Sequence, residues 1–209
     1  MSIRRSLLGT SDKSALLLEA AAAINAGRLI ILPVTSGYVL ACDAQNASAL
    51  SDLDAARHAK NEYISSIIFP DIATLANEVT LPELDPALVE IFEKGLLTLI
   101  LKRDLSFRSN HGGTKELIAV NIPENSWVQN LLAKTGPCAV GAASIINEGI
   151  PKKISEVSQE IKNVVEIAVD AGTIKGSVST VINFVEKKPV IVRIGTISES
   201  EIKALIPNL

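Results

Sequence analysis

The chain has 209 residues and is 47% hydrophobic, which is enough apolar material for one sizeable core and excludes a disordered chain. Its formal net charge is −3, so it lacks the whole-molecule basic field that drives avid non-specific binding of nucleic acids. No apolar run approaches the roughly 18 residues that a transmembrane helix needs. Charged residues also interrupt the N-terminal stretch that otherwise resembles a signal peptide, so we expect a cytoplasmic protein without a membrane segment.

Helices and strands are predicted to alternate along the chain. In the first half, the patterns predict a helix that Ser11 caps and Gly27 ends, strands at 28–33 and 38–44, a helix from Asn46 through Arg57, a strand at 65–69, a helix that begins at Asp85-Pro86 and ends near Gly95, and a strand at 96–102. In the second half, they predict a polar loop at 103–115, a strand at 117–121, a helix at 126–134, a strand at 138–144, a helix at 155–163, a strand at 164–170, a loop at 171–178, strands at 179–185 and 190–194, and a last helix with a capping box of Ser198 and Glu201.

This order predicts an α/β fold, with a twisted mixed sheet flanked by helices in a single domain over residues 1–209. Aromatic residues make up only 3% of the chain, so the core must consist mostly of Ala, Val, Ile and Leu, which suits strands that are buried on both faces. Functional side chains are expected in the loops at the strand ends.

The cysteines and histidines do not predict a metal site. Cys42 and Cys138 both lie in apolar runs, which favours buried free thiols over a disulfide or a metal pair. The only histidines are His58 and His111, too few for an ordinary zinc site. The phosphate-loop, dinucleotide, metalloprotease, C-x-x-C and esterase motifs are absent as well.

Two hydroxyl-rich segments are candidate binding sites. The turn after the second predicted strand presents Thr35, Ser36 and Tyr38 to one cleft, where they can bind a small polar ligand; an ordinary β-turn with a permissive Gly37 is the alternative that these residues alone favour. Residues 170–181 combine two glycines, a lysine and several hydroxyls. Backbone N–H groups in such a loop can hold an anion, and a flexible connection is the equal alternative.

An arginine near the end of the chain also needs explanation. Arg193 lies among apolar residues, and a guanidinium in such surroundings needs a carboxylate or phosphate partner. A structural ion pair and a ligand contact are both open.

In this order, the segments resemble the YrdC family of threonylcarbamoyl-AMP synthases from about Ala20 to Ile197. The family's P-T-[DE]-T-x-Y-G-L is similar to Pro33 through Leu40, its P-G-P-L-T to Lys94 through Thr98, its R-x-P to Asn121-Ile122-Pro123, its S-A-N to Ala142-Ala143-Ser144, its S-T-V to Ser179-Thr180-Val181, and its R-x-G to Arg193-Ile194-Gly195.

The resemblance implies a mixed α/β sheet with a concave basic face. Family members join L-threonine, bicarbonate and ATP into threonylcarbamoyl-adenylate and release pyrophosphate, for the threonylcarbamoyl modification of certain tRNAs. Some members bind double-stranded RNA. The resemblance therefore implies ATP with Mg²⁺ as a substrate and no tightly bound cofactor. By position, it assigns Ser36, Tyr38, Ser179 and Thr180 to the substrate side, Arg57, Thr98, Ser144 and Arg193 to the nucleotide side, and no residue to catalysis or to a resident metal.

The departures from the family motifs mostly remove charge. Asn121 replaces the arginine of R-x-P, and near Arg57 the arginine of K-x-R is lost unless Lys60 replaces it. In S-A-N, the serine is replaced by Ala142 and the asparagine by Ser144. In the opening motif, the first threonine is replaced by Val34, the acidic residue by Thr35 and the glycine by Val39. Since a charge-assisted hydrogen bond contributes about 1.5–3 kcal/mol, losing two or three forfeits on the order of 3–9 kcal/mol of ATP binding.

Three hypotheses follow. The chain is a divergent threonylcarbamoyl-AMP synthase, or it is a non-catalytic relative that binds a nucleotide, RNA or a protein, or it is an enzyme of this fold with a changed substrate. RNA-binding proteins use aromatic side chains for stacking and basic grooves for the phosphates, so the few aromatic residues and the negative net charge of this chain argue against RNA as the ligand. For the third hypothesis, only His111 in the polar loop is a spare acid–base group.

Overall fold

The computed structural model describes residues 3–8, 12–59, 66–103, 117–206 and 209. Its strands are β1 (Ile3–Ser6), β2 (Ile30–Val34), β3 (Gly37–Asp43), β4 (Ser66–Ile68), β5 (Leu97–Lys102), β6 (Leu117–Asn121), β7 (Cys138–Ala142), β8 (Ile167–Asp170), β9 (Thr180–Asn183) and β10 (Val190–Arg193). Its helices are α1 (Lys13–Asn25), α2 (Ala47–Ala56), α3 (Ile72–Glu78), α4 (Pro86–Glu93), α5 (Ser126–Thr135), the short 3₁₀ helix η1 (Ile154–Glu156), α6 (Gln159–Val164) and α7 (Glu199–Leu205).

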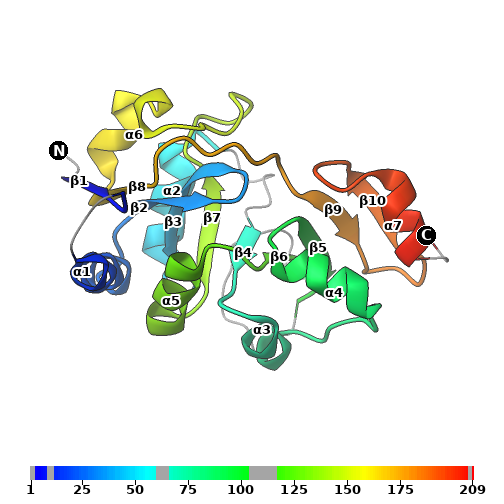
Figure 1. Cartoon of the computed structure of the whole chain (residues 1–209). Helices are drawn as coiled ribbons and strands as arrows, with labels where there is room; N and C mark the ends of the chain where they lie inside the picture. The colour runs from blue at the N-terminus through cyan, green and yellow to red at the C-terminus, as the bar shows by residue number, and fades with distance from the viewer. Residues whose placement is uncertain (1–2, 9–11, 60–65, 104–116, 207–208) are drawn as a thin grey trace.

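These strands form one mixed, open sheet in the order β1-β8-β2-β3-β7-β4-β6-β5-β9-β10 (Figure 1). The pairs β1–β8, β2–β8, β4–β6 and β5–β9 are parallel, and the other pairs are antiparallel. Strands that are far apart in the chain are therefore neighbours in the sheet, so the loops at their ends lie close together.

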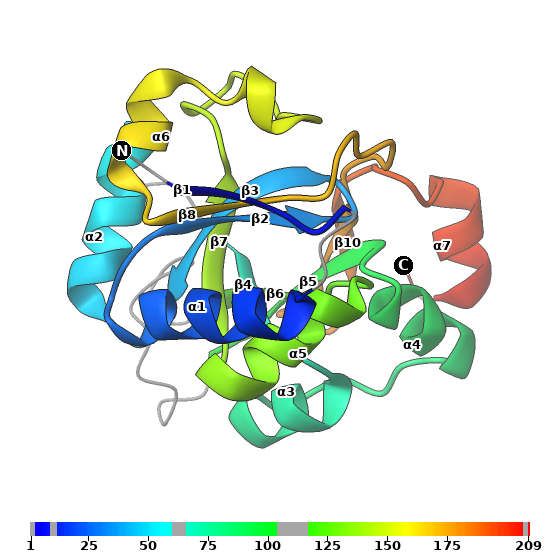
Figure 2. The ribbon, with the colours of Figure 1, turned by 60° about the vertical axis from the view of Figure 1, so that its left-hand side comes forward.

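Helices cover both faces of the sheet, and each face has its own apolar core. On one face, α1 and α5 lie side by side (Figure 2), and Leu16, Ile24 and Leu131 pack against the strands. On the other face, α2, α3, α4, α6 and α7 contribute the second cluster, which contains Leu53 and Phe92. The central strands β2 and β3 are buried over nearly their whole length, as their apolar sequences predict.

The predicted α/β fold, with a mixed sheet flanked by helices, is confirmed. The details differ at several places. The side chain of Asp12, not Ser11, caps α1 by accepting a hydrogen bond from the backbone of Ala15. The predicted helix at 155–163 is divided into η1 and α6, because Ser158 caps a new helix there. Strand β1 and helix α3 were not predicted, and the polar loop with His111 lies almost wholly outside the described residues.

Two further expectations concern composition. Cys42 and Cys138 are free and buried, as predicted. No helix in the described part of the chain is long and apolar enough to cross a membrane.

Candidate functional site

A cavity of about 350 Å³ lies where the ends of several strands meet. Its walls come from the turn between β2 and β3, the end of α2, β4 to β7, the segment after β7, and the approach to β9 and β10. The lining includes Ser36, Arg57, Thr98, Ser144, Ser179 and Arg193, which are six of the eight residues that the family resemblance selects. Among the described residues, this lining carries two guanidinium groups and no carboxylate.

One end of the cavity is a corner of two hydroxyls and a guanidinium. The hydroxyls of Thr98 and Ser179 are 2.8 Å apart and share a hydrogen bond. The guanidinium of Arg193 donates to the Ser179 carbonyl at 2.9 and 3.2 Å and lies 3.3 Å from the Ser179 hydroxyl. These residues are brought together because β9 pairs with β5 on one side and with β10 on the other.

Of the two alternatives for Arg193, the structural ion pair is not found among the described residues, where the carbonyl and hydroxyl of Ser179 hold this side chain. A guanidinium has five N–H donors, and neutral acceptors do not cancel its charge. Arg193 thus places a full positive charge at this end of the cavity.

The second cation is Arg57, which follows the last residue of α2 and is only 7% exposed. Its carbonyl accepts a hydrogen bond of 3.0 Å from the backbone of Ile146, which ties the end of α2 to the segment after β7. In that segment, the hydroxyl of Ser144 donates to the carbonyl of Gly149. The nucleotide-side candidates Arg57 and Ser144 thus share one wall of the cavity.

The turn that carries Thr35 and Ser36 is fixed by two other segments. The backbone of Tyr38 donates to the Pro151 carbonyl at 2.8 Å. The ammonium of Lys152 donates to the carbonyls of Ser36 and Gly176. Sequence reasoning missed Lys152, because nothing in the run around it distinguishes this lysine from a solvated one.

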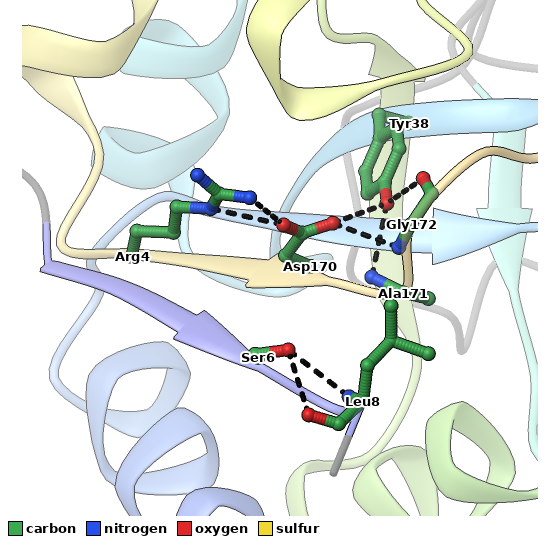
Figure 3. Close-up of polar contacts among 7 residues, drawn as sticks. All are labelled: Arg4, Ser6, Leu8, Tyr38, Asp170, Ala171 and Gly172. Carbon is green, nitrogen blue, oxygen red and sulfur yellow. Dashed lines mark hydrogen bonds and ion pairs between the residues drawn. The ribbon is translucent and has the colours of Figure 1, made fainter. Parts of the chain in front are cut away.

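Tyr38 itself lies outside the cavity lining, contrary to the expectation that it shares a cleft with Thr35 and Ser36. Its side chain is fully buried, and its hydroxyl contacts the Asp170 carboxylate at 3.0 Å, the Gly172 carbonyl at 2.7 Å and the Ala171 N–H at 2.9 Å (Figure 3). Burial is the main cause that raises the pKa of Tyr38 to about 12. Tyr38 therefore connects β3 to the loop after β8 and does not line the cavity.

Asp170 is the centre of this network. Besides Tyr38, its carboxylate accepts from the Arg4 guanidinium on β1 and from the Gly172 N–H at 2.8 Å. Burial opposes its ionisation, but the hydrogen bonds from Arg4, Gly172 and Tyr38 outweigh burial and hold the pKa of Asp170 below its usual value. The loop after β8 is thus a firmly held connection where it leaves the strand.

Thr180 also lies outside the cavity lining. It is fully buried; its hydroxyl donates to the Ile197 carbonyl at 2.6 Å and accepts from the N–H groups of Gly195 and Ile197. Its contacts hold the bend after β10, next to Arg193, so it shapes the site without facing it.

Asn121, which occupies the position of a family arginine, lines the cavity. Its amide donates to the carbonyls of Gly95 and Leu97. An amide is neutral, so Asn121 does not replace the charge of the family arginine. No group of three His, Cys, Asp or Glu side chains within the described ranges could hold a metal ion. Lys60 and His111, the other candidates considered from the sequence, lie outside the described residues.

Comparison with known proteins identifies this architecture. The family model for Sua5, YciO and YrdC, described as "Telomere recombination", matches residues 22–195. The chain is 29% identical over 205 residues to a threonylcarbamoyl-AMP synthase of Bacillus subtilis, covering 95% of this chain and 58% of that protein. It is 31% identical over 196 residues to a threonylcarbamoyl-AMP synthase of Pyrococcus abyssi, covering 91% and 57%.

Solved structures share the fold. P. abyssi Sua5 complexed with L-threonine matches with a TM-score of 0.90 at 24% identity, over 100% of this chain and 62% of that one. Escherichia coli YciO matches with a TM-score of 0.80 at 21% identity, over 95% and 98%. The chain therefore spans about six tenths of the Sua5 protein and nearly the whole of YciO.

Proposed function

Because the chain belongs to the Sua5/YciO/YrdC family, we propose that it synthesises L-threonylcarbamoyladenylate from L-threonine, bicarbonate and ATP. The observation that carries this proposal is the lining of the cavity, with two arginines, six hydroxyl side chains and no carboxylate among the described residues. Guanidinium groups bind phosphates and carboxylates through paired hydrogen bonds. Such a lining suits a polyanionic nucleotide beside a small hydroxylated amino acid.

In the proposed reaction, the threonine amine forms a bond to the bicarbonate carbon, water leaves, and a carbamate results. A carbamate oxygen then attacks the α-phosphorus of ATP, the bond to the β-phosphate breaks, and pyrophosphate leaves. These steps need no covalent enzyme intermediate, so the protein acts by placing the reactants and stabilising developing charge.

The residues divide by position. Ser36 and Ser179 hold threonine, and Thr98 and Arg193 hold ATP, with Arg57 and Ser144 on the nucleotide side. Mg²⁺ enters with ATP and is bound by the phosphates and water. Tyr38 and Thr180 act only by holding the walls of the cavity.

The test is release of pyrophosphate by the purified, folded protein from ATP and Mg²⁺. Release that needs both threonine and bicarbonate supports the proposal, and no release beside an active control enzyme refutes it. Arg193→Ala should weaken ATP binding by roughly 10- to 100-fold. Because Arg193 is exposed, this variant should keep the melting temperature of the wild type, and an unchanged ATP affinity would count against its assigned role.

Non-catalytic binding is the second candidate function, and Asn121 favours it. Its neutral amide is engaged by two backbone carbonyls, so the position where the family has an arginine supplies no charge. ATP binding without pyrophosphate release would select this candidate. For an RNA partner, whether tRNA or double-stranded RNA, a filter-binding assay at low salt decides, because phosphate contacts are strongest there.

The location of action follows from the proposed substrates. ATP and tRNA are available in the cytoplasm, and we expect the protein to act there. Fractionation of cells that express the full chain would check this expectation.

A further inference from the structure

Strand β7 contains a glycine whose backbone does not require one. Gly141 pairs with Leu40, next to the last pair of the antiparallel β3–β7 ladder. It is not among the residues with a positive φ angle, so any L-residue can adopt its backbone conformation. The reason for a glycine must therefore be the space around it.

That space is filled by Arg57. A β-carbon on Gly141 would lie 2.1 Å from Nη1, 2.5 Å from Cζ and 2.8 Å from Nε of this side chain. Contacts of a β-carbon below 3.0 Å are essentially never observed. The guanidinium thus occupies the volume that any other residue at position 141 would need.

We propose that Gly141 is a positioning residue, which admits the Arg57 guanidinium into the cavity wall and so gives the cavity its second cation. Arg57 and Gly141 both line the cavity. The proposal deepens the proposed function, because it names what places one of the nucleotide-side residues. It does not require that the protein complete the synthesis.

The physical consequence of adding one methyl group is specific. The clashing atoms are at the end of a flexible side chain, so the side chain can shift while the backbone stays in place. The backbone of Arg57 is held separately, through its carbonyl and Ile146. Gly141→Ala should therefore fold, keep the position of α2, and displace only the guanidinium.

The first experiment measures this displacement without any ligand. Phenylglyoxal modifies accessible arginines, and peptide mass spectrometry gives the rate at each residue. Arg57 is 7% exposed in the wild type, so its modification should be slow there and at least several-fold faster in Gly141→Ala. The exposed Arg193 is the internal reference and should react equally in both proteins.

The second experiment is a double-mutant cycle with ATP and Mg²⁺, followed by calorimetric titration. Gly141→Ala and Arg57→Ala should each weaken binding by roughly 10- to 100-fold. Because both changes remove the same guanidinium, the double variant should match Arg57→Ala within about twofold.

Three outcomes would overturn the inference: an unchanged modification rate of Arg57 in Gly141→Ala, additive losses in the cycle, or a Gly141→Ala protein that does not fold even when Arg57 is also replaced by alanine. The failure of the proposed function looks different. If the wild type binds ATP but releases no pyrophosphate, the synthase assignment fails and the inference about Gly141 stands. If the wild type binds no ATP, the modification rates of Arg57 in the wild type and in Gly141→Ala decide alone whether Gly141 positions Arg57.

Discussion

Replacing Tyr38 by phenylalanine removes one oxygen from the centre of the network in Figure 3 and leaves the ring in place. The ring is fully buried, so the apolar packing is retained. The hydroxyl has a single proton, which it shares between the Gly172 carbonyl at 2.7 Å and the Asp170 carboxylate at 3.0 Å, and it accepts a hydrogen bond from the Ala171 N–H.

The expected cost follows from these contacts. A neutral hydrogen bond contributes about 0.5–1.5 kcal/mol, a bond to a charged group about 1.5–3 kcal/mol, and an N–H group left without an acceptor costs about 1–3 kcal/mol. Since one donated and one accepted bond are lost, Tyr38→Phe should lower the free energy of unfolding by about 2–4 kcal/mol. For a chain of this size, that lowers the melting temperature by roughly 4–16 °C.

The assay is thermal unfolding followed by circular dichroism, together with a urea titration at neutral pH. The midpoint should fall with an unchanged m value, because the surface exposed on unfolding is the same. A melting temperature within 1 °C of the wild type would refute the reasoning, since it would mean that the network adds nothing to stability.

Four further predictions concern other groups. The pKa of Asp170 is lowered in the folded state. The ionised carboxylate therefore stabilises the fold above the usual aspartate pKa of about 4, and this stabilisation is lost as the pH falls through the lower pKa of the folded state. In Asp170→Asn, the free energy of unfolding should lack this decrease when it is measured over an acid titration. Lys152→Met removes the hydrogen bonds from the ammonium to the carbonyls of Ser36 and Gly176. It should raise the KM for threonine, measured by pyrophosphate release, roughly tenfold, while Lys152→Arg should retain part of the affinity. Gly176→Ala places a β-carbon 2.0 Å from a backbone carbonyl oxygen and should cost about 1–3 kcal/mol in a urea titration. Burial raises the pKa of Cys138 to about 12 and also raises that of Cys42, so a thiol reagent at pH 8 should label neither residue until the protein unfolds.

The sequence predicts the strands well because burial on both faces leaves a simple signal, a short apolar run between turn residues. Strands β2, β3, β5 and β6 each fall within two residues of their predicted bounds. Strand β1 gives no such signal, because Ile3–Ser6 contains two arginines and is held by pairing with β8. Its place in the sheet depends on a partner more than 160 residues away.

The site is less predictable for a related reason. Position in the chain selects Tyr38 together with Ser36, but Ser36 lies in the turn before β3, and within β3 it is Val39 that lines the cavity. Successive residues of a strand point to opposite faces, so Tyr38 faces the core, where its hydroxyl finds partners. Tyr38 therefore bonds to Asp170 and Gly172. Conversely, Gly141 carries no chemistry of its own, and only the packed structure shows that it makes room for Arg57.

The two arginines show how a cavity that has lost family cations can still attract an anion. Arg193 is held by the neutral oxygens of Ser179, and Arg57 lies against a glycine in a wall without carboxylates among the described residues. A carboxylate partner would neutralise the charge of Arg193 before a ligand arrived, whereas its contacts with Ser179 fix the direction of the guanidinium and leave its charge for the ligand. For the proposed function, what decides ATP binding is whether the two positive charges of Arg57 and Arg193 reach the phosphates together, which Arg57→Ala and Arg193→Ala test one at a time.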